Sequence, residues 1–169
     1  MSDARTPAAD LLGTYRGGLL DAYGAQADGL RRALQSRAGD EHSPLEAGGW
    51  SPHQVAWHVR AVETRAYLPR LEQLLTQDHP TLGDFDGDGW MARHYTADEA
   101  WERIVDDLQA ARRSMQTRLE ASPDSVWSCV GRHSYWGTRT LMWWVERSIA
   151  HIDEHIAQLS AASGSMEPG

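Results

Sequence analysis

The segment His151-Ile152-Asp153-Glu154-His155 places two histidines four residues apart. Residues at this spacing lie one turn apart on the same face of an α-helix, and two imidazoles so placed can bind one metal ion, as in other helical histidine pairs that bind zinc. Apolar residues recur around the pair at helical spacing, namely Leu141, Val145, Ile152, Ile156 and Leu159. We therefore predict a helix over residues 138–160, with both histidines within or beside its buried face.

A second amphipathic segment, residues 51–75, contains the candidate for a third metal ligand. Ser51 and Gln54 have the spacing of a capping box, which predicts that a helix begins here. An apolar stripe follows, made of Val55, Val59, Val62 and Ala66. His58 lies on this stripe, so we expect its side chain to point inward. Pro69 removes one helical hydrogen bond, so we expect the helix to kink or end near it.

Two further segments have helical periodicity. Residues 7–37 carry an apolar face, and a third helix is expected from a second capping box at Thr96–Glu99 to Ser122, before Pro123. Residues 38–49, 76–95 and 123–137 read as connections. Four amphipathic helices predict an all-α four-helix bundle, with a long connection between helices 2 and 3. Metal sites in such bundles are built from inward side chains on facing helices.

The composition limits the class of protein. The chain has 169 residues, a net charge of −8 and one cysteine, Cys129. We expect a single domain over residues 1–160 and a flexible tail over 161–169. The acidic balance and the lack of a basic stripe argue against nucleic acid as a partner. No apolar run approaches the roughly 18 residues of a membrane span. With no signal peptide and no possible internal disulfide, we expect a cytoplasmic protein.

Three motifs, in this order and spacing, resemble the DinB-like metalloenzyme family. They are Gly49-Trp50-Ser51, then His58-Val59-Arg60-Ala61-Val62-Glu63, and finally the stretch from His151 to Leu159. The resemblance covers most of the chain. It implies a four-helix bundle with a divalent metal site of three histidines, which by position are His58, His151 and His155. The family is often dimeric, so the resemblance also implies a homodimer.

The resemblance also implies a reaction. Characterised relatives are metal-dependent S-transferases or isomerases that use a small thiol such as mycothiol, bacillithiol or glutathione. Three neutral imidazoles leave one coordination position open, as in catalytic zinc sites, and zinc deprotonates a bound thiol. We therefore expect a divalent ion, zinc first with nickel as the alternative, and transfer of a low-molecular-weight thiol to an electrophilic small molecule. Two alternatives stay open: a metal-binding bundle without catalysis, in a structural or carrier role, and a metal-dependent hydrolase.

The side chains around the expected centre can be assigned only in outline. No catalytic residue can be singled out. Trp57, Trp144 and Arg147 are the candidates for the substrate pocket, with Trp136, Trp143 and Arg139 as further possibilities. Glu63 lies five residues from His58 and therefore off its face, so we expect it to hydrogen-bond to a ligand or to be a partner between helices, and not to bind the metal. His53 is expected in an exposed first turn. The acidic stretch 84–89 imitates a calcium loop but has Tyr95 where a bidentate Glu is needed, so we interpret it as a turn.

Overall fold

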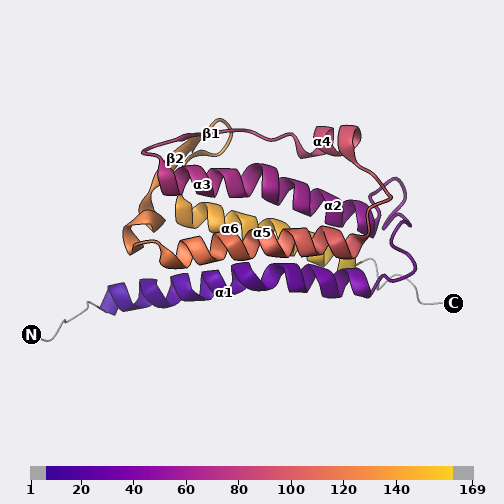
Figure 1. The fold of residues 1–169 in the computed structure, drawn as a ribbon, viewed down its shortest axis with the longest axis horizontal. Helices are drawn as coiled ribbons and strands as arrows, with labels where there is room; N and C mark the ends of the chain where they lie inside the picture. Colours follow the sequence, from indigo (N-terminus) through magenta and orange to yellow (C-terminus); the bar gives the residue numbers. More distant parts are fainter. Residues whose placement is uncertain (1–6, 162–169) are drawn as a thin grey trace, which may run out of the picture.

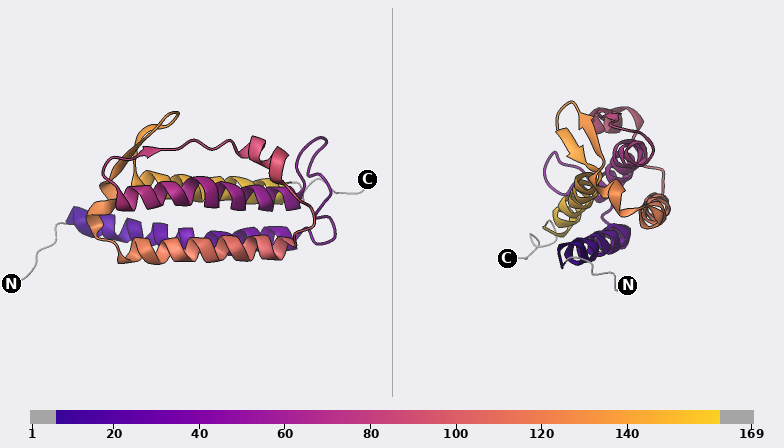
Figure 2. Two further views of the ribbon diagram at one scale, coloured as in Figure 1. Left: turned by 45° about the horizontal axis from the view of Figure 1, so that its top comes forward. Right: turned by 90° about the vertical axis from the view of Figure 1, so that its left-hand side faces the viewer.

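Helices dominate the computed structural model, which describes residues 7–161 (Figure 1). Four long rods form the bundle: α1 (Pro7–Gln35), the composite rod α2–η1–α3, α5 (Trp101–Ala121) and α6 (Leu141–Ala161). In Figure 2, α1 and α5 lie side by side in one layer, and the composite rod and α6 form the other. The predicted all-α four-helix bundle is therefore confirmed. The predicted tail, 161–169, falls outside the described residues except for the last residue of α6.

The composite rod begins as the sequence predicts. The Ser51 hydroxyl accepts a hydrogen bond from the Gln54 backbone N–H at 3.3 Å, and the Gln54 side chain accepts one from the Ser51 N–H at 2.9 Å. This capping box starts α2 (Pro52–Val62). The rod does not end at Pro69, which lies in the first turn of α3 (Leu68–Thr76). Instead, a π-helical turn, η1 (Glu63–Tyr67), joins α2 to α3.

Both long connections contain structure that the sequence did not reveal. The first holds β1 (Thr81–Leu82) and the short helix α4 (Gly87–His94), which Asp86 caps by accepting the Gly89 N–H at 2.8 Å. The second holds the 3-10 helix η2 (Asp124–Ser128) and the hairpin of β2 (Val130–His133) and β3 (Gly137–Thr140). β1 pairs with β2 in parallel, and β2 pairs with β3 antiparallel. The resulting three-stranded sheet covers one end of the α3–α6 layer (Figure 2).

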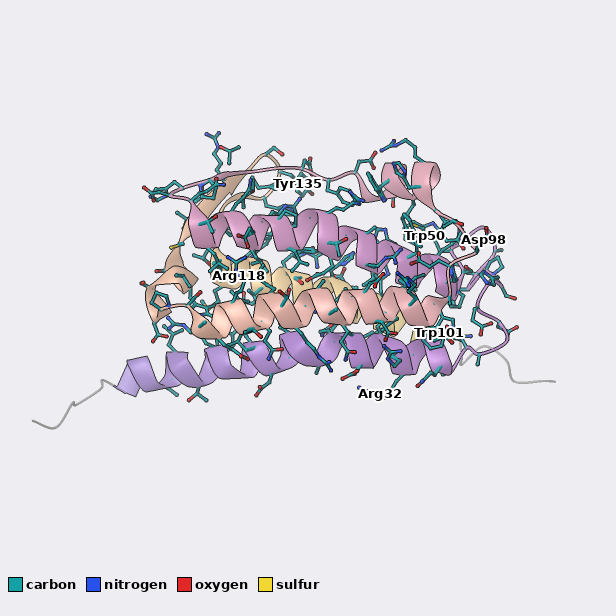
Figure 3. All side chains as sticks on the ribbon, viewed as in Figure 1. Arg32, Trp50, Asp98, Trp101, Arg118 and Tyr135 are labelled. Carbon is teal, nitrogen blue, oxygen red and sulfur yellow. The ribbon has the colours of Figure 1, made fainter. Side chains whose placement is uncertain are left out.

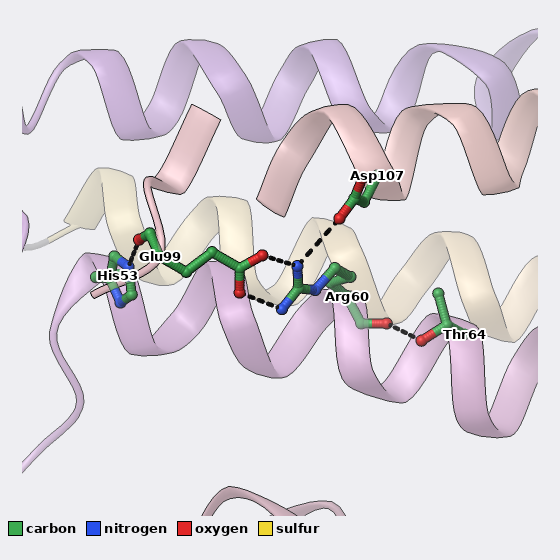
Figure 4. Close-up of polar contacts among 5 residues, drawn as sticks. All are labelled: His53, Arg60, Thr64, Glu99 and Asp107. Carbon is green, nitrogen blue, oxygen red and sulfur yellow. Dashed lines mark hydrogen bonds and ion pairs between the residues drawn. The ribbon is translucent and has the colours of Figure 1, made fainter. Parts of the chain in front are cut away.

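The start of α5 differs from the prediction. The helix begins at Trp101 after Ala100, without a side-chain cap, so the capping box expected at Thr96–Glu99 is wrong. The Glu99 carboxylate is instead paired with Arg60 of α2, at 2.5 and 2.7 Å (Figure 4). His53 was also predicted wrongly. It is 1% exposed, and its ring nitrogens contact the Tyr95 hydroxyl at 2.9 Å and the Glu99 carbonyl at 2.6 Å.

Side chains fill the space between the rods (Figure 3). One apolar cluster lies around α2 and the first half of α5, and a second lies around α3, the hairpin and the first half of α6. Tyr135, at the hairpin turn, is 78% exposed. No helix within residues 7–161 is both long enough and apolar enough to cross a membrane.

Candidate metal centre

Three histidines from two helices of one layer of the bundle converge. His58 comes from α2, and His151 and His155 lie one turn apart on α6. One ring nitrogen of each lies within 4.8 Å of the others. The ring centroids are 5.4 Å apart for His58 and His151, 5.1 Å for His58 and His155, and 4.8 Å for the α6 pair. The packing of α2 against α6 thus brings together the three side chains that the sequence selected.

The surroundings keep these imidazoles neutral. Burial, reinforced by the neighbouring imidazoles, lowers the pKa of His58 to about 4 and that of His151 to about 3. Burial also lowers the pKa of His155. The His155 Nδ1 lies 3.0 Å from the Gln158 Oε1, which leaves its Nε2 for another partner. The Nδ1 atoms of His58 and His151 are buried and have no hydrogen-bond partner in the described part of the chain.

This donor set fits a divalent transition-metal ion. Metal binding requires neutral imidazole, and here burial favours the neutral form before any ion arrives. Imidazole suits zinc, nickel, copper and iron, so the residues do not select one of them. Three protein ligands are the number found in catalytic zinc sites, where a further position stays open to water or substrate.

A cavity of about 300 Å³ lies beside His58 and His151. Its walls come from three elements: the composite rod, the segment 84–88 before and within the start of α4, and the β2–β3 hairpin. Those wall residues are Val62, Ala66, Tyr67, Arg70, Asp84, Phe85, Asp86, Gly87, Asp88 and Trp136. At Gly87, an added Cβ would lie 3.1 Å from the His58 Cε1 and 3.3 Å from the Val62 Cγ2. Glycine therefore allows the segment to lie directly against the histidine.

The three pocket candidates from the sequence do not line this cavity. Trp57 lines a separate cavity, together with Arg60 and Trp90. Trp144 is fully buried, and its ring centroid lies 6.4 Å from that of Tyr67. It therefore packs against a residue of the cavity wall without lining the cavity itself. Arg147 is paired with Glu154 at 3.0 Å.

Of the three further pocket candidates, only one lines the cavity. Trp136 lines the cavity, and Trp143 packs against it with ring centroids 5.5 Å apart. Arg139 is exposed and lies beside Trp143.

Sequence reasoning missed two polar residues of the cavity, Tyr67 and Arg70. In a continuous α-helix, Arg70 would be turned by about 120° from His58, because each residue advances about 100°. The π-helical turn inserts about one extra residue, which brings Arg70 to within about 20° of His58. No local signal in the sequence marks this turn, so the periodicity could not place either residue at the site.

A buried polar network lies beside the histidines. The Glu63 carboxylate, 0% exposed, accepts hydrogen bonds from the Tyr23 hydroxyl and the Ser148 hydroxyl, both at 2.8 Å. It also pairs with Arg112 of α5 at 2.8 Å. Because Ser148 lies one turn before His151, the network ties η1 to α6 next to the site. Glu63 is thus confirmed as a partner between helices.

Comparisons with known proteins agree with this architecture. The sequence profile of the DinB superfamily matches residues 19–159, a range that contains all three histidines. Among solved structures, YfiT from Bacillus subtilis, described as a probable metal-dependent hydrolase with an unusual four-helix bundle topology, has a TM-score of 0.81 and 17% sequence identity. The match covers 98% of this chain and 92% of the YfiT chain. A search of curated proteins found no match.

Proposed function

The chain belongs to the DinB superfamily, and from this premise we propose that it holds one divalent metal ion through His58, His151 and His155 and acts as a metal-dependent enzyme on a small molecule. The observation that carries the proposal is the convergence of three neutral imidazoles, two of them buried and that of His155 half-buried, with an open cavity beside His58 and His151. A purely structural ion would need no such cavity, since structural zinc sites are closed by a fourth protein ligand.

Hydrolysis is the reaction we place first. A bound divalent ion polarises a carbonyl or phosphoryl oxygen and lowers the pKa of a bound water to about 7. The chain itself would orient the substrate with the polar side chains of the cavity and limit the access of bulk water with Val62, Ala66 and Trp136. YfiT, which shares the fold, is described as a probable metal-dependent hydrolase. This description supports placing hydrolysis before thiol transfer.

Thiol transfer is the second candidate, and one observation favours it. No carboxylate hydrogen-bonds to any of the three histidines in the part of the chain that the structure describes. The carboxylates that line the cavity, Asp84, Asp86 and Asp88, are exposed on its rim, so no base for activating water is fixed against the histidines by a hydrogen bond. A thiol needs no such base, because a coordinating thiol loses its proton to the metal ion. The partner would then be a small thiol of the mycothiol, bacillithiol or glutathione type.

The first experiment is elemental analysis of the purified protein and of two variants. His58→Ala should lose stoichiometric metal, whereas His79→Ala should keep it, because the His79 side chain is 73% exposed and paired only with Asp78. Equal metal content in His58→Ala and the wild type would refute the assignment.

Turnover then separates the reactions. Ester and amide substrates test hydrolysis, and a thiol with a model electrophile tests transfer, each with and without a chelator. Metal binding without chelator-sensitive turnover in either assay would point to a non-catalytic bundle. We propose small molecules rather than nucleic acid as partners, and a cytoplasmic homodimer, which sedimentation and fractionation can test.

A further inference from the structure

Arg70 is a buried cation without a counter-ion. It lies on α3, is 7% exposed and lines the cavity beside the histidines. Its Nε and Nη2 donate hydrogen bonds to the Gly83 carbonyl at 3.1 and 2.9 Å, and its Cζ lies 4.8 Å from the centre of the Trp144 ring. Within residues 7–161, no carboxylate forms an ion pair with it. Because burying an unpaired charge is costly, this arrangement indicates a position for an anion from outside the chain.

Asp84 is the carboxylate that comes nearest to fulfilling that role. It attracts Arg70 electrostatically but does not pair with it. The Asp84 side chain is 73% exposed and lies 3.7 Å from the His133 Nε2. Water and salt screen a carboxylate in this position, so Asp84 does not neutralise the guanidinium. The Nη1 of Arg70 has no hydrogen-bond partner in the described chain.

Tyr67 adds a second donor on the same side of the rod. It lies three residues before Arg70, hence on the same helical face, and it lines the same cavity. Its ring centroid is 5.7 Å from that of His151. Its hydroxyl makes no hydrogen bond to any described residue. A tyrosine hydroxyl is protonated at neutral pH, so it can donate a hydrogen bond.

We propose that Tyr67 and Arg70 form a carboxylate-binding subsite beside the three histidines. The substrate class is then a small molecule that carries a carboxylate a few bonds away from the group presented to the histidines. This inference rests on the proposed function for the role of the histidines, but the subsite itself is built from the chain's own donors. Charge-assisted hydrogen bonds from a guanidinium and a hydroxyl are among the stronger polar contacts that a protein can offer a carboxylate.

The carboxylates at the rim of the cavity favour a cationic ligand, whereas the Arg70 guanidinium favours an anionic one. Asp84, Asp86 and Asp88 line the rim, and all three are exposed. One oxygen of Asp86 is also occupied in capping α4. Exposed charges act through water, where two unit charges 4 Å apart interact by only about 1 kcal/mol. The buried guanidinium acts at hydrogen-bond distance in a medium of lower dielectric constant, so its preference for an anion should prevail.

The test uses protein loaded with Co²⁺ and three small thiols of similar size. These are β-mercaptopropionate, its neutral amide β-mercaptopropionamide, and the amine cysteamine. Binding is followed by the thiolate-to-cobalt charge-transfer absorption. We expect the carboxylate to bind about tenfold or more tightly than the amide, as expected for a hydrogen bond to a charged group.

Two variants and one control locate the effect. Arg70→Gln should abolish the preference for the carboxylate, and Tyr67→Phe should reduce it, because both weaken binding of the carboxylate much more than binding of the neutral amide. Arg118→Gln is the matched control, because Arg118 is paired with Glu72 on the surface and does not line the cavity. It should keep the full preference.

Equal binding of the acid and the amide by the wild type, or tighter binding of cysteamine, would overturn the proposal. If Arg70→Gln does not fold, the wild-type comparison and Tyr67→Phe decide the matter. Failure of the wild type to bind Co²⁺ would count against the proposed function instead. In that case metal-free protein decides on the subsite: propionate, but not propionamide, should shift the NMR signals of the Arg70 side-chain N–H groups, and the absence of that shift would refute it.

Discussion

Replacing Arg112 with methionine should destabilise the protein strongly, although Arg112 lies outside the cavity. Arg112 is 1% exposed, and its partner Glu63 is 0% exposed. The guanidinium pairs with Glu63 at 2.8 Å, donates to the Ser148 hydroxyl at 2.8 Å and to the Tyr23 carbonyl at 3.0 Å. Arg112→Met preserves much of the side-chain length but leaves the Glu63 charge and the Tyr23 carbonyl without these partners.

The expected magnitude follows from the burial of both charges. Removing one partner of a buried ion pair costs about 3–5 kcal/mol, because the other charge stays desolvated. Glu63 keeps two donors, the hydroxyls of Tyr23 and Ser148, so we expect the lower part of that range. For a chain of this size, 1 kcal/mol corresponds to about 2–4 °C in Tm. For a loss of about 3–4 kcal/mol, the melting temperature should therefore fall by roughly 6–16 °C.

Urea and thermal unfolding of chelator-treated protein measure this loss without a contribution from bound metal. Arg113→Met is the control, since Arg113 is the exposed neighbour on α5 and should change stability by less than about 0.5 kcal/mol. Glu63→Leu and the double variant complete a double-mutant cycle, in which we expect a coupling of about 1–3 kcal/mol. A loss below about 1 kcal/mol in Arg112→Met would refute the reasoning, because breaking a fully buried ion pair typically costs about 3–5 kcal/mol.

Three further predictions concern the site and its supports. Because the unfolded chain protonates His58 near pH 6.5 and the folded chain only near pH 4, the stability of metal-free protein should fall by up to about 3 kcal/mol from this group as the pH drops from 6.5 to 4; His58→Leu should reduce this loss in the urea midpoint, the rest coming from His151 and His155, and an unchanged loss would show that the burial of His58 is not a cause. Gly87→Ala should weaken metal binding, measured by competition with a chelator, because the added Cβ would press on His58. Gly83→Ala is the control, because there is open space around Gly83. Equal metal affinities of the two variants would contradict the close approach of Gly87 to His58. Ser51→Ala should cost about 1 kcal/mol in urea unfolding through loss of the helix cap, and an unchanged midpoint would show that the cap contributes nothing.

Features encoded by neighbouring residues could be predicted from the sequence. The start of α2 follows from Ser51 and Gln54, three residues apart, and the pair on α6 follows from a spacing of four. His58 was placed inward because it lies on a regular apolar stripe. These signals depend only on helical geometry, so they needed no knowledge of the rest of the fold.

Features that depend on distant partners could not be predicted in the same way. Thr96–Glu99 has the form of a capping box, but the carboxylate of Glu99 is taken by Arg60, 39 residues away. β1 is only two residues long and pairs with a strand about 50 positions later in the chain, so it has no periodicity of its own. The π-helical turn, which brings Tyr67 and Arg70 to the cavity, likewise leaves no local pattern.

The helices carry the metal ligands and the connections form much of the cavity rim, which has a consequence for how the substrate range of such proteins can change. The three histidines lie on helices of the bundle, whereas much of the cavity rim comes from segment 84–88 and from Trp136 in the hairpin. Surface connections tolerate insertions and exchange far better than packed helices. Substitutions and insertions in segment 84–88 and in the β2–β3 hairpin can therefore change the substrate while the helices that carry the three histidines stay the same.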